Sequence, residues 1–296
     1  MKKAPLLVLL CLFMLRSATI WSQWIPFYEN KTSSNGLLVM NLKGKVKSVQ
    51  QKAYKAIEVD GLIQTGEKTI MPGYLSVNAD FLMQFDDSAR TISEIYPTTP
   101  DTFQLHHYYR TKNTELIIHQ TRVKDHYQDY RYKYKGDGTI EERTEYTKRG
   151  EDVWDHITTY KYNAAGKPIE SSTGLRKEKA RVKTVYQYDS KGFLCVRSDY
   201  KKDTLVYKET FKNDAKGNVL ERTYYATDCK SIDHVFIYEY DVNKNVIRKD
   251  YMKPEGKLSM RYLYEYEYDK YGNWTRRIDS QNGKKLYVIE RQLEYY

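Results

Sequence analysis

Aromatic and polar residues alternate strictly along the stretch 262–268. Even-numbered positions hold tyrosine, namely Tyr262, Tyr264, Tyr266 and Tyr268. The odd-numbered positions between them hold Leu or Glu. Successive side chains on a β-strand point to opposite faces, so this stretch is typical of a strand with tyrosine along one side. Asp269–Gly272 then predicts a tight turn, because Asp caps turns and Gly adopts positive φ. Asn273 begins the predicted return strand.

The same unit recurs throughout the chain. We align the copies on the last residue of the turn, here called the anchor. The anchors fall at residues 89, 113, 138, 166, 192, 217, 244 and 272, with spacings of 24, 25, 28, 26, 25, 27 and 28. Such a narrow range of spacings over eight copies indicates a structural repeat of about 26 residues.

Three columns of residues support this register. Six residues before the anchor, aromatic residues dominate: Met83, His107, Tyr132, Tyr160, Tyr186, Phe211, Tyr238 and Tyr266. A second set of mostly aromatic residues lies four residues before the anchor, and mostly polar residues separate the two columns. Five residues after the anchor, most copies have a basic residue: Arg143, Arg197, Arg222, Lys249 and Arg277. This alternation predicts that the aromatic columns are buried and that the polar residues between them are exposed.

Each unit therefore holds two strands and two turns, with Asn282-Gly283 marking the turn at the opposite end of the last unit. We predict an all-β fold of tandem β-hairpin repeats that form one elongated, twisted or coiled antiparallel sheet. Open sheets rarely exceed roughly ten strands without curling. We therefore expect the sheet either to coil with its tyrosines inward or to stack in two layers.

The motif Y-x-Y-D-x-x-G-N resembles the YD repeat of the RHS family. The best copies include Tyr266–Asn273 and Tyr186–Gly192, and the resemblance covers residues 80 to 296. The chain also resembles short exported YD-repeat proteins of Bacteroidota that end soon after a G-N-W motif, as in Gly272–Trp274. The resemblance implies long antiparallel hairpin arrays that spiral into a shell. In large members the shell encloses a toxin, whereas this chain is far shorter and ends in the stretch 286–296.

Residues 1–22 are interpreted as a secretory signal peptide. Lys2 and Lys3 precede a twelve-residue apolar run, 4–15, that is too short to span a membrane as a helix. Two alternatives remain, a lipoprotein that is lipidated at Cys11 and a buried helix of the mature fold. Residues 23–42 are expected to be irregular, and residues 43–296 to form the repeat domain. The predicted location is periplasmic, cell-surface or secreted, with no membrane span.

Composition changes this picture in two ways. The 296 residues include 30 tyrosines, which supply the buried area that few aliphatic residues provide here. Removing residues 1–22 takes away three of the 49 basic residues and none of the 39 acidic ones, which leaves a net charge of +7. These charges are spread along strands instead of forming a basic stripe, so we expect no nucleic-acid partner.

The sequence offers little catalytic chemistry. His106, His107 and His119 could suggest a metal site, but adjacent strand residues face opposite ways, and we expect these side chains to pack in the sheet. No nucleophile or phosphate-loop motif is present, and the Asp column is explained by turn capping. We therefore predict that the protein is not an enzyme, with no cofactor and no catalytic or metal-binding residues.

The tyrosine columns are the remaining functional candidate. They are either the core of a sheet poor in aliphatic residues or a platform that stacks on sugar rings. We select Trp154, Trp274, Tyr264 and Tyr266 as candidate binding residues and expect both tryptophans to be exposed. The leading hypothesis is a non-catalytic envelope protein that binds a glycan or an envelope protein through a sheet face. The alternatives are an envelope hydrolase and a structural shell or accessory to a secreted effector.

Two cysteines follow the predicted signal peptide, Cys195 and Cys229. Cys195 lies three residues after its anchor, whereas Cys229 lies twelve residues after the anchor of the next unit. If neighbouring anchors share one edge of the sheet, the two cysteines differ by roughly five or more residues along the strands, which is more than about 15 Å. A disulfide requires Cα atoms within about 7 Å. We therefore predict two free thiols.

Overall fold

The computed structural model describes most of the predicted repeat domain. The described residues are 41–69, 80–85, 91–99, 102–110, 115–123, 126–135, 139–149, 152–176 and 182–296. For the described residues between 91 and 130, the structure describes the backbone alone. The predicted signal peptide lies outside the described residues, as do nearly all of the segment 23–42 and the anchors at 89, 113 and 138.

Every regular element in the described residues is a β-strand. The strands are β1 (Val46–Val59), β2 (Leu62–Lys68), β3 (Phe81–Phe85), β4 (Thr91–Thr99), β5 (Thr102–Arg110), β6 (Glu115–Val123), β7 (His126–Tyr134), β8 (Ile140–Arg149), β9 (Asp152–Tyr162), β10 (Pro168–Leu175), β11 (Val182–Tyr188), β12 (Leu194–Lys201), β13 (Thr204–Asn213), β14 (Val219–Tyr225), β15 (Ile232–Tyr240), β16 (Val246–Met252), β17 (Leu258–Tyr268), β18 (Trp274–Gln281) and β19 (Lys284–Tyr295). Across these ranges we find no helix of the length and apolarity that crossing a membrane requires.

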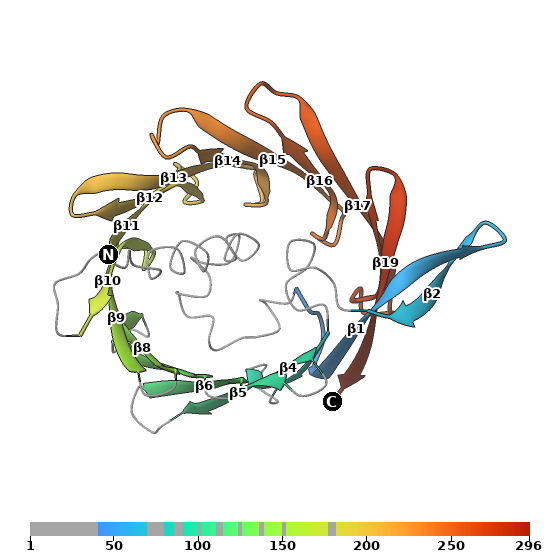
Figure 1. Cartoon of the computed structure of the whole chain (residues 1–296), viewed down its shortest axis with the longest axis horizontal. Coiled ribbons are helices and arrows are strands. Elements are labelled where there is room, and N and C mark those ends of the chain that lie inside the picture. The colour runs from blue at the N-terminus through green and yellow to red at the C-terminus, as the bar shows by residue number, and fades with distance from the viewer. Residues whose placement is uncertain are drawn as a thin grey trace, which may run out of the picture.

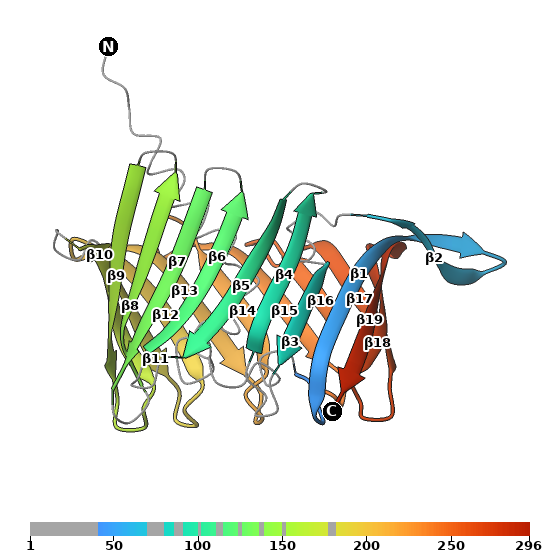
Figure 2. The same ribbon diagram turned by 90° about the horizontal axis from the view of Figure 1, so that it is seen from below.

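All of these strands belong to one antiparallel sheet that coils round (Figure 1). From β3 to β19 each strand pairs with its neighbour in sequence, and β1 pairs with β19 along one edge and with β3 along the other. The far half of β1 pairs with β2, and this hairpin projects away from the rest of the sheet (Figure 2). The predicted coiled antiparallel sheet of hairpins is confirmed.

The D-x-x-G turns within the described residues lie at the positions predicted from the repeat. In the turn after β11, the Asp189 Oδ1 atom accepts hydrogen bonds from the backbone N–H groups of Lys191 and Phe193, at 3.0 and 2.8 Å. Gly192 adopts φ +81°, which costs Gly little because it lacks a Cβ atom. The anchors with positive φ are Gly166, Gly192, Gly217, Lys244 and Gly272. At the opposite end, Asn282 and Gly283 have φ 50° and 83°, as a type I′ hairpin turn requires.

The two faces of the sheet differ in burial as the columns predict. We call the side that carries the aromatic columns the tyrosine face. Six residues before the anchor, most described side chains are buried: Met83, Tyr160, Tyr186, Phe211 and Tyr238. The residues between the two columns are exposed: Gln84, Lys133, Lys161, Gln187, Lys212, Glu239 and Glu267. Side chains converge on the concave side of a curved sheet, so we assign the more buried tyrosine face to the interior of the coil.

The column four residues before the anchor is mostly half-buried and so is less buried than predicted, because its tyrosine hydroxyls reach the edge of the neighbouring unit. The hydroxyl of Tyr188 donates a hydrogen bond to the carbonyl of Pro168 at 2.7 Å. Tyr162 and Tyr240 donate in the same way to Ile140 and Val219, at 2.7 and 2.9 Å. In each case the acceptor lies two residues after the anchor of the preceding unit. These bonds explain why the column is tyrosine in most copies.

Conventional hydrophobic packing is concentrated where β1 joins the two ends of the array. One buried cluster combines residues from β1 and β3 with Leu42, namely Leu42, Val46, Val49, Phe81, Met83 and Phe85. A second joins Ala53 of β1 to Trp274 and Ile289. Elsewhere on the tyrosine face, buried charges pair: Arg222 donates to Glu209 at 2.6 Å, with both side chains almost fully buried.

Both described cysteines are free thiols, as predicted. Cys195 lies in β12, close to its D-x-x-G turn, and Cys229 lies in the turn between β14 and β15 at the opposite end of the hairpins. Burial raises the pKa of both thiols, which lowers their reactivity.

Candidate functional site

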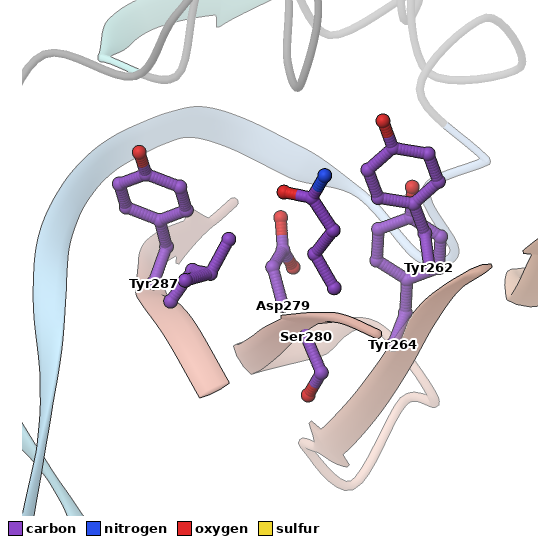
Figure 3. Close-up of a pocket in the computed structure, with 7 residues that line it drawn as sticks. Tyr262, Tyr264, Asp279, Ser280 and Tyr287 are labelled. Carbon is purple, nitrogen blue, oxygen red and sulfur yellow. The ribbon is translucent and has the colours of Figure 1, made fainter. Parts of the chain in front are cut away.

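A shallow hollow lies on the tyrosine face across β17, β18 and β19. Its volume is about 200 Å³, including space open to solvent. We call it the tyrosine pocket, and its lining residues are Tyr262, Tyr264, Asp279, Ser280, Gln281, Leu286 and Tyr287. Figure 3 shows the three tyrosines and Asp279 projecting to one side of the strands and Ser280 to the other.

Strand register explains why these side chains meet. Tyr264 of β17 lies directly opposite Asp279 of β18, which in turn lies opposite Tyr287 of β19. Tyr262 lies opposite Gln281. Directly opposed residues of an antiparallel pair share one face and have neighbouring side chains. The pocket is therefore assembled from three strands in two registered rows.

An ion pair fixes the carboxylate at the base of the pocket. The Nε and Nη2 atoms of Arg277 donate to the two carboxylate oxygens of Asp279 at 2.6 and 2.9 Å. Asp279 is only 6% exposed, and burial raises the pKa of this carboxyl although Arg277 acts in the opposite direction. The guanidinium of Arg277 also lies 5.4 Å from the centre of the Tyr264 ring. The pair holds both Asp279 and the aromatic wall in place.

Lys249 of β16 lies at the edge of the tyrosine pocket. It is directly opposite Tyr262, and its Nζ atom is 5.7 Å from the centre of the Tyr262 ring and 4.3 Å from that of Phe236. Burial, with the nearby charge of Arg222, lowers the pKa of Lys249 to about 8. Within the described residues Lys249 forms no ion pair, so its charge is stabilised mainly by aromatic rings.

Arg291 of β19 is a second cation without a carboxylate partner in the described part of the chain. Its guanidinium lies 3.5 Å from the centre of the Trp274 ring, and its Nε atom donates to Gln51 at 2.9 Å. The Nη1 atom is buried and has no hydrogen-bond partner among the described groups. Burial and the neighbouring Arg277 lower the pKa of Arg291.

The four predicted binding residues differ in their exposure and in their position relative to the tyrosine pocket. Trp274 is only 6% exposed and packs against Arg291 and Arg277, so the expectation that it is an exposed contact is wrong. Trp154 is half-buried on β9, which is distant from the pocket in the strand order. Both predicted tyrosines are half-buried near the pocket. Tyr264 lines it, whereas Tyr266 donates to the carbonyl of Val246 at 2.9 Å.

Sequence reasoning selected Tyr264 and missed the other residues of this site, among them Asp279, Tyr287, Lys249 and Arg291. One available signal was the basic column, which includes Lys249 and Arg277 but served only to fix the register. Another was the spacing Arg-x-Asp, which occurs at Arg197 and again at Arg277. The side chains of His106, His107 and His119 lie outside the described part. In the part that is described, no three His, Cys, Asp or Glu side chains gather as metal ligands would.

The fold and pocket together define an antiparallel hairpin-repeat protein with an aromatic, charged inner face. No protein-family model and no curated protein sequence matches this chain. Among solved structures, similar chains include a porin-like protein from Bacteroides uniformis, with 11% identity, a TM-score of 0.42 and coverage of 85% of this chain and 98% of that one. A porin-like protein from Bacteroides vulgatus has 16% identity, a TM-score of 0.36 and the same coverage.

The Tc holotoxin pore of Photorhabdus luminescens is also similar over part of its length. It shares 14% identity with a TM-score of 0.30, and the match covers 72% of this chain but 16% of the toxin chain. Similarities of this size do not indicate a function for this chain.

Proposed function

We propose that this protein is an exported, non-catalytic binding protein of the cell envelope, and that its tyrosine face binds a glycan. The tyrosine pocket is the observation that supports this most directly. Three aromatic rings line one small hollow together with the carboxylate of Asp279 and the amide of Gln281. A sugar ring presents apolar C–H groups on its faces and hydroxyls at its edge, so it fits aromatic walls with polar groups between them.

The hollow is small and partly open to solvent, so it can hold only part of a ligand that lies along the tyrosine face. Further aromatic side chains continue along the same face. The ring centres of Tyr251 and Phe236 are 5.4 Å apart, and the His234 ring stacks on the Tyr224 ring with their centres 4.3 Å apart. A glycan chain lying across several strands would contact these rings in turn.

The hydrolase hypothesis has less support from this site. Glycoside hydrolysis usually requires two carboxyl groups that flank the scissile bond. Asp279 is the one carboxylate in the lining of the tyrosine pocket, and both of its oxygens accept hydrogen bonds from Arg277. A carboxylate held in this way is suited to orienting polar groups and poorly suited to transferring protons. We therefore favour binding over catalysis.

A glycan array probed with residues 23–296 tests this proposal. We expect binding to a defined set of glycans that Tyr264→Leu and Tyr287→Leu each weaken at least tenfold, because these substitutions remove aromatic walls and keep apolar bulk. Tyr271→Leu is the control, since Tyr271 is exposed on the turn after β17, outside the pocket. Circular dichroism checks that the variants remain folded. Absence of glycan binding, or equal binding by all variants, would contradict the proposal.

A further inference from the structure

We propose that the glycan bound by the tyrosine face is anionic, and that Lys249 contacts its carboxylate or sulfate groups. This inference rests on the proposed glycan-binding function. It adds the charge of the ligand and the residue that recognises it. The observations that support it are the balance of charges on the tyrosine face and the position of Lys249 beside the tyrosine pocket.

Most cations of this face already have carboxylate partners. Arg197 pairs with Asp199 at 3.2 Å and approaches Glu209 at 3.6 Å. Arg222 donates to Glu209, and Arg277 forms its two-bond pair with Asp279. Each of these carboxylates is held by at least one arginine. None of these ion pairs includes Lys249 or Arg291, so the described half of this face from β12 to β19 carries surplus positive charge.

Lys249 is the surplus cation that a ligand in the pocket would meet. It shares Tyr262 with the pocket, because Tyr262 is both its cross-strand partner and a lining residue. The aromatic rings of Phe236 and Tyr262 flank its ammonium group and exclude part of its hydration. A partly desolvated ammonium without a counter-ion is stabilised by an approaching anion more than a hydrated surface lysine is.

Arg291 reinforces the preference for an anion. Its guanidinium is held between Trp274 and Gln51, and its Nη1 atom has no described acceptor. Buried charges are normally paired, and a buried unpaired cation raises the local positive potential. Lys249 and Arg291 lie three strands apart, on β16 and β19, with the tyrosine pocket on the strands from β17 to β19. Arg291 lies on β19 four residues beyond the lining residue Tyr287, so it adds to the positive potential of the face that an anionic chain would meet.

Binding of three polymers to residues 23–296 tests the inference. The probes are polygalacturonate, its carboxyl-reduced neutral form and dextran sulfate, measured by calorimetry at 50 and 300 mM NaCl. We expect at least one anionic polymer to bind tenfold or more tightly than the neutral form, and added salt to weaken that binding. Binding to dextran sulfate alone would assign the anionic group to sulfate and would support the inference.

Matched lysine variants locate the contact. Lys249→Gln is expected to weaken binding of the anionic polymer about tenfold, and Lys249→Arg is expected to retain most of it. Lys212→Gln is the control, because it removes the same charge from an exposed residue of the opposite face. Equal losses in Lys249→Gln and Lys212→Gln would indicate nonspecific attraction and overturn the inference. Equal binding of the neutral polymer would overturn it too, while leaving glycan binding intact; no binding of any polymer would contradict both.

Discussion

Tyrosine acts in this sheet both as an apolar filler and as a hydrogen-bond donor. Tyr186 and Tyr238 are buried among other side chains of the tyrosine face, where an aliphatic core would otherwise be needed. Tyr188 and Tyr240 place their rings on the same face and use their hydroxyls to bond the preceding unit. A phenol ring combines large buried area with a polar end, which explains how so few aliphatic residues can stabilise the array.

The difference between the two faces predicts unequal costs of truncation. Tyr186→Ala should lower the free energy of unfolding by about 3–5 kcal/mol, because it empties a buried aromatic position. Gln187→Ala, at the adjacent exposed position, should change it by about 0.5 kcal/mol or less. Urea denaturation followed by circular dichroism measures both. Similar effects at the two positions would show that the tyrosine face is open to solvent and not packed.

The lowered pKa of Lys249 predicts that the stability of the protein depends on pH. The pKa of Lys249 is lowered to about 8 in the folded protein and has its ordinary value near 10.5 in the unfolded chain. Between these values the unfolded chain binds more protons, so stability rises with pH above about 8. We expect the wild type to gain on the order of 1–2 kcal/mol relative to Lys249→Met between pH 7 and 9.5. A constant difference between the two proteins across this range would contradict the assignment.

At the scale of the element, the hairpin is defined by its two turns. The D-x-x-G turn combines an Asp side chain that accepts two backbone N–H groups with an anchor residue at positive φ. The opposite turns vary, from Asn282-Gly283 to Lys202-Asp203. The conserved geometry at one end and variable geometry at the other explain why the anchors, and not the opposite turns, reveal the repeat in the sequence.

Two anchors offer a reciprocal test of this geometry. Gly166 has φ +71° with open space around it, so Gly166→Ala should cost about 1 kcal/mol through backbone strain alone. Lys244 adopts φ +65° with a side chain, so Lys244→Gly should leave stability unchanged or raise it by up to about 1 kcal/mol. Thermal denaturation of both variants provides the measurement. If Lys244→Gly instead destabilises the protein by more than Gly166→Ala does, strain at the anchor is not the controlling factor.

At the scale of the whole molecule, β1 joins the first and last hairpins of the array. It pairs with β19 from Val46 to Lys55 and with β3 from Ser48 to Gln51. The segment before it is tied to the last D-x-x-G turn by Asn273, whose side chain accepts from the Lys43 N–H at 2.7 Å and donates to the Lys43 carbonyl at 2.8 Å. Contacts across more than 200 residues of sequence therefore complete the fold.

Asn273 allows this closure to be tested against a matched position. Asn273→Ala should lower the free energy of unfolding by about 2–3 kcal/mol, because it removes the partner of two partly buried backbone groups of Lys43. Asn218 occupies the same motif position, but among the described residues its side chain bonds only Asp214 in its own turn. Asn218→Ala should therefore cost about 1 kcal/mol or less. Chemical denaturation compares them, and equal costs would mean that the contact with Lys43 does not stabilise the closure.

Local rules made the repeating part of the fold predictable. Alternation of aromatic and polar residues defined the strands, and Asp and Gly at fixed spacing defined the turns. The same rules failed for the site, since the tyrosine pocket requires Tyr264, Asp279 and Tyr287 from three strands to share one register. Trp274 was misplaced because a tryptophan next to a turn resembles an exposed contact, whereas Arg277 and Arg291 cover its ring.

The sequence by itself determined the hairpin unit, its register and the face on which the tyrosines lie, because each depends on interactions within about 26 residues. Only the tertiary structure decided that β1 pairs with both β19 and β3, and that Lys249 and Arg291 remain without carboxylate partners in the described chain. These features depend on which distant residues meet when the sheet coils. Alternation along one strand specifies the face of a residue but not its neighbours on other strands.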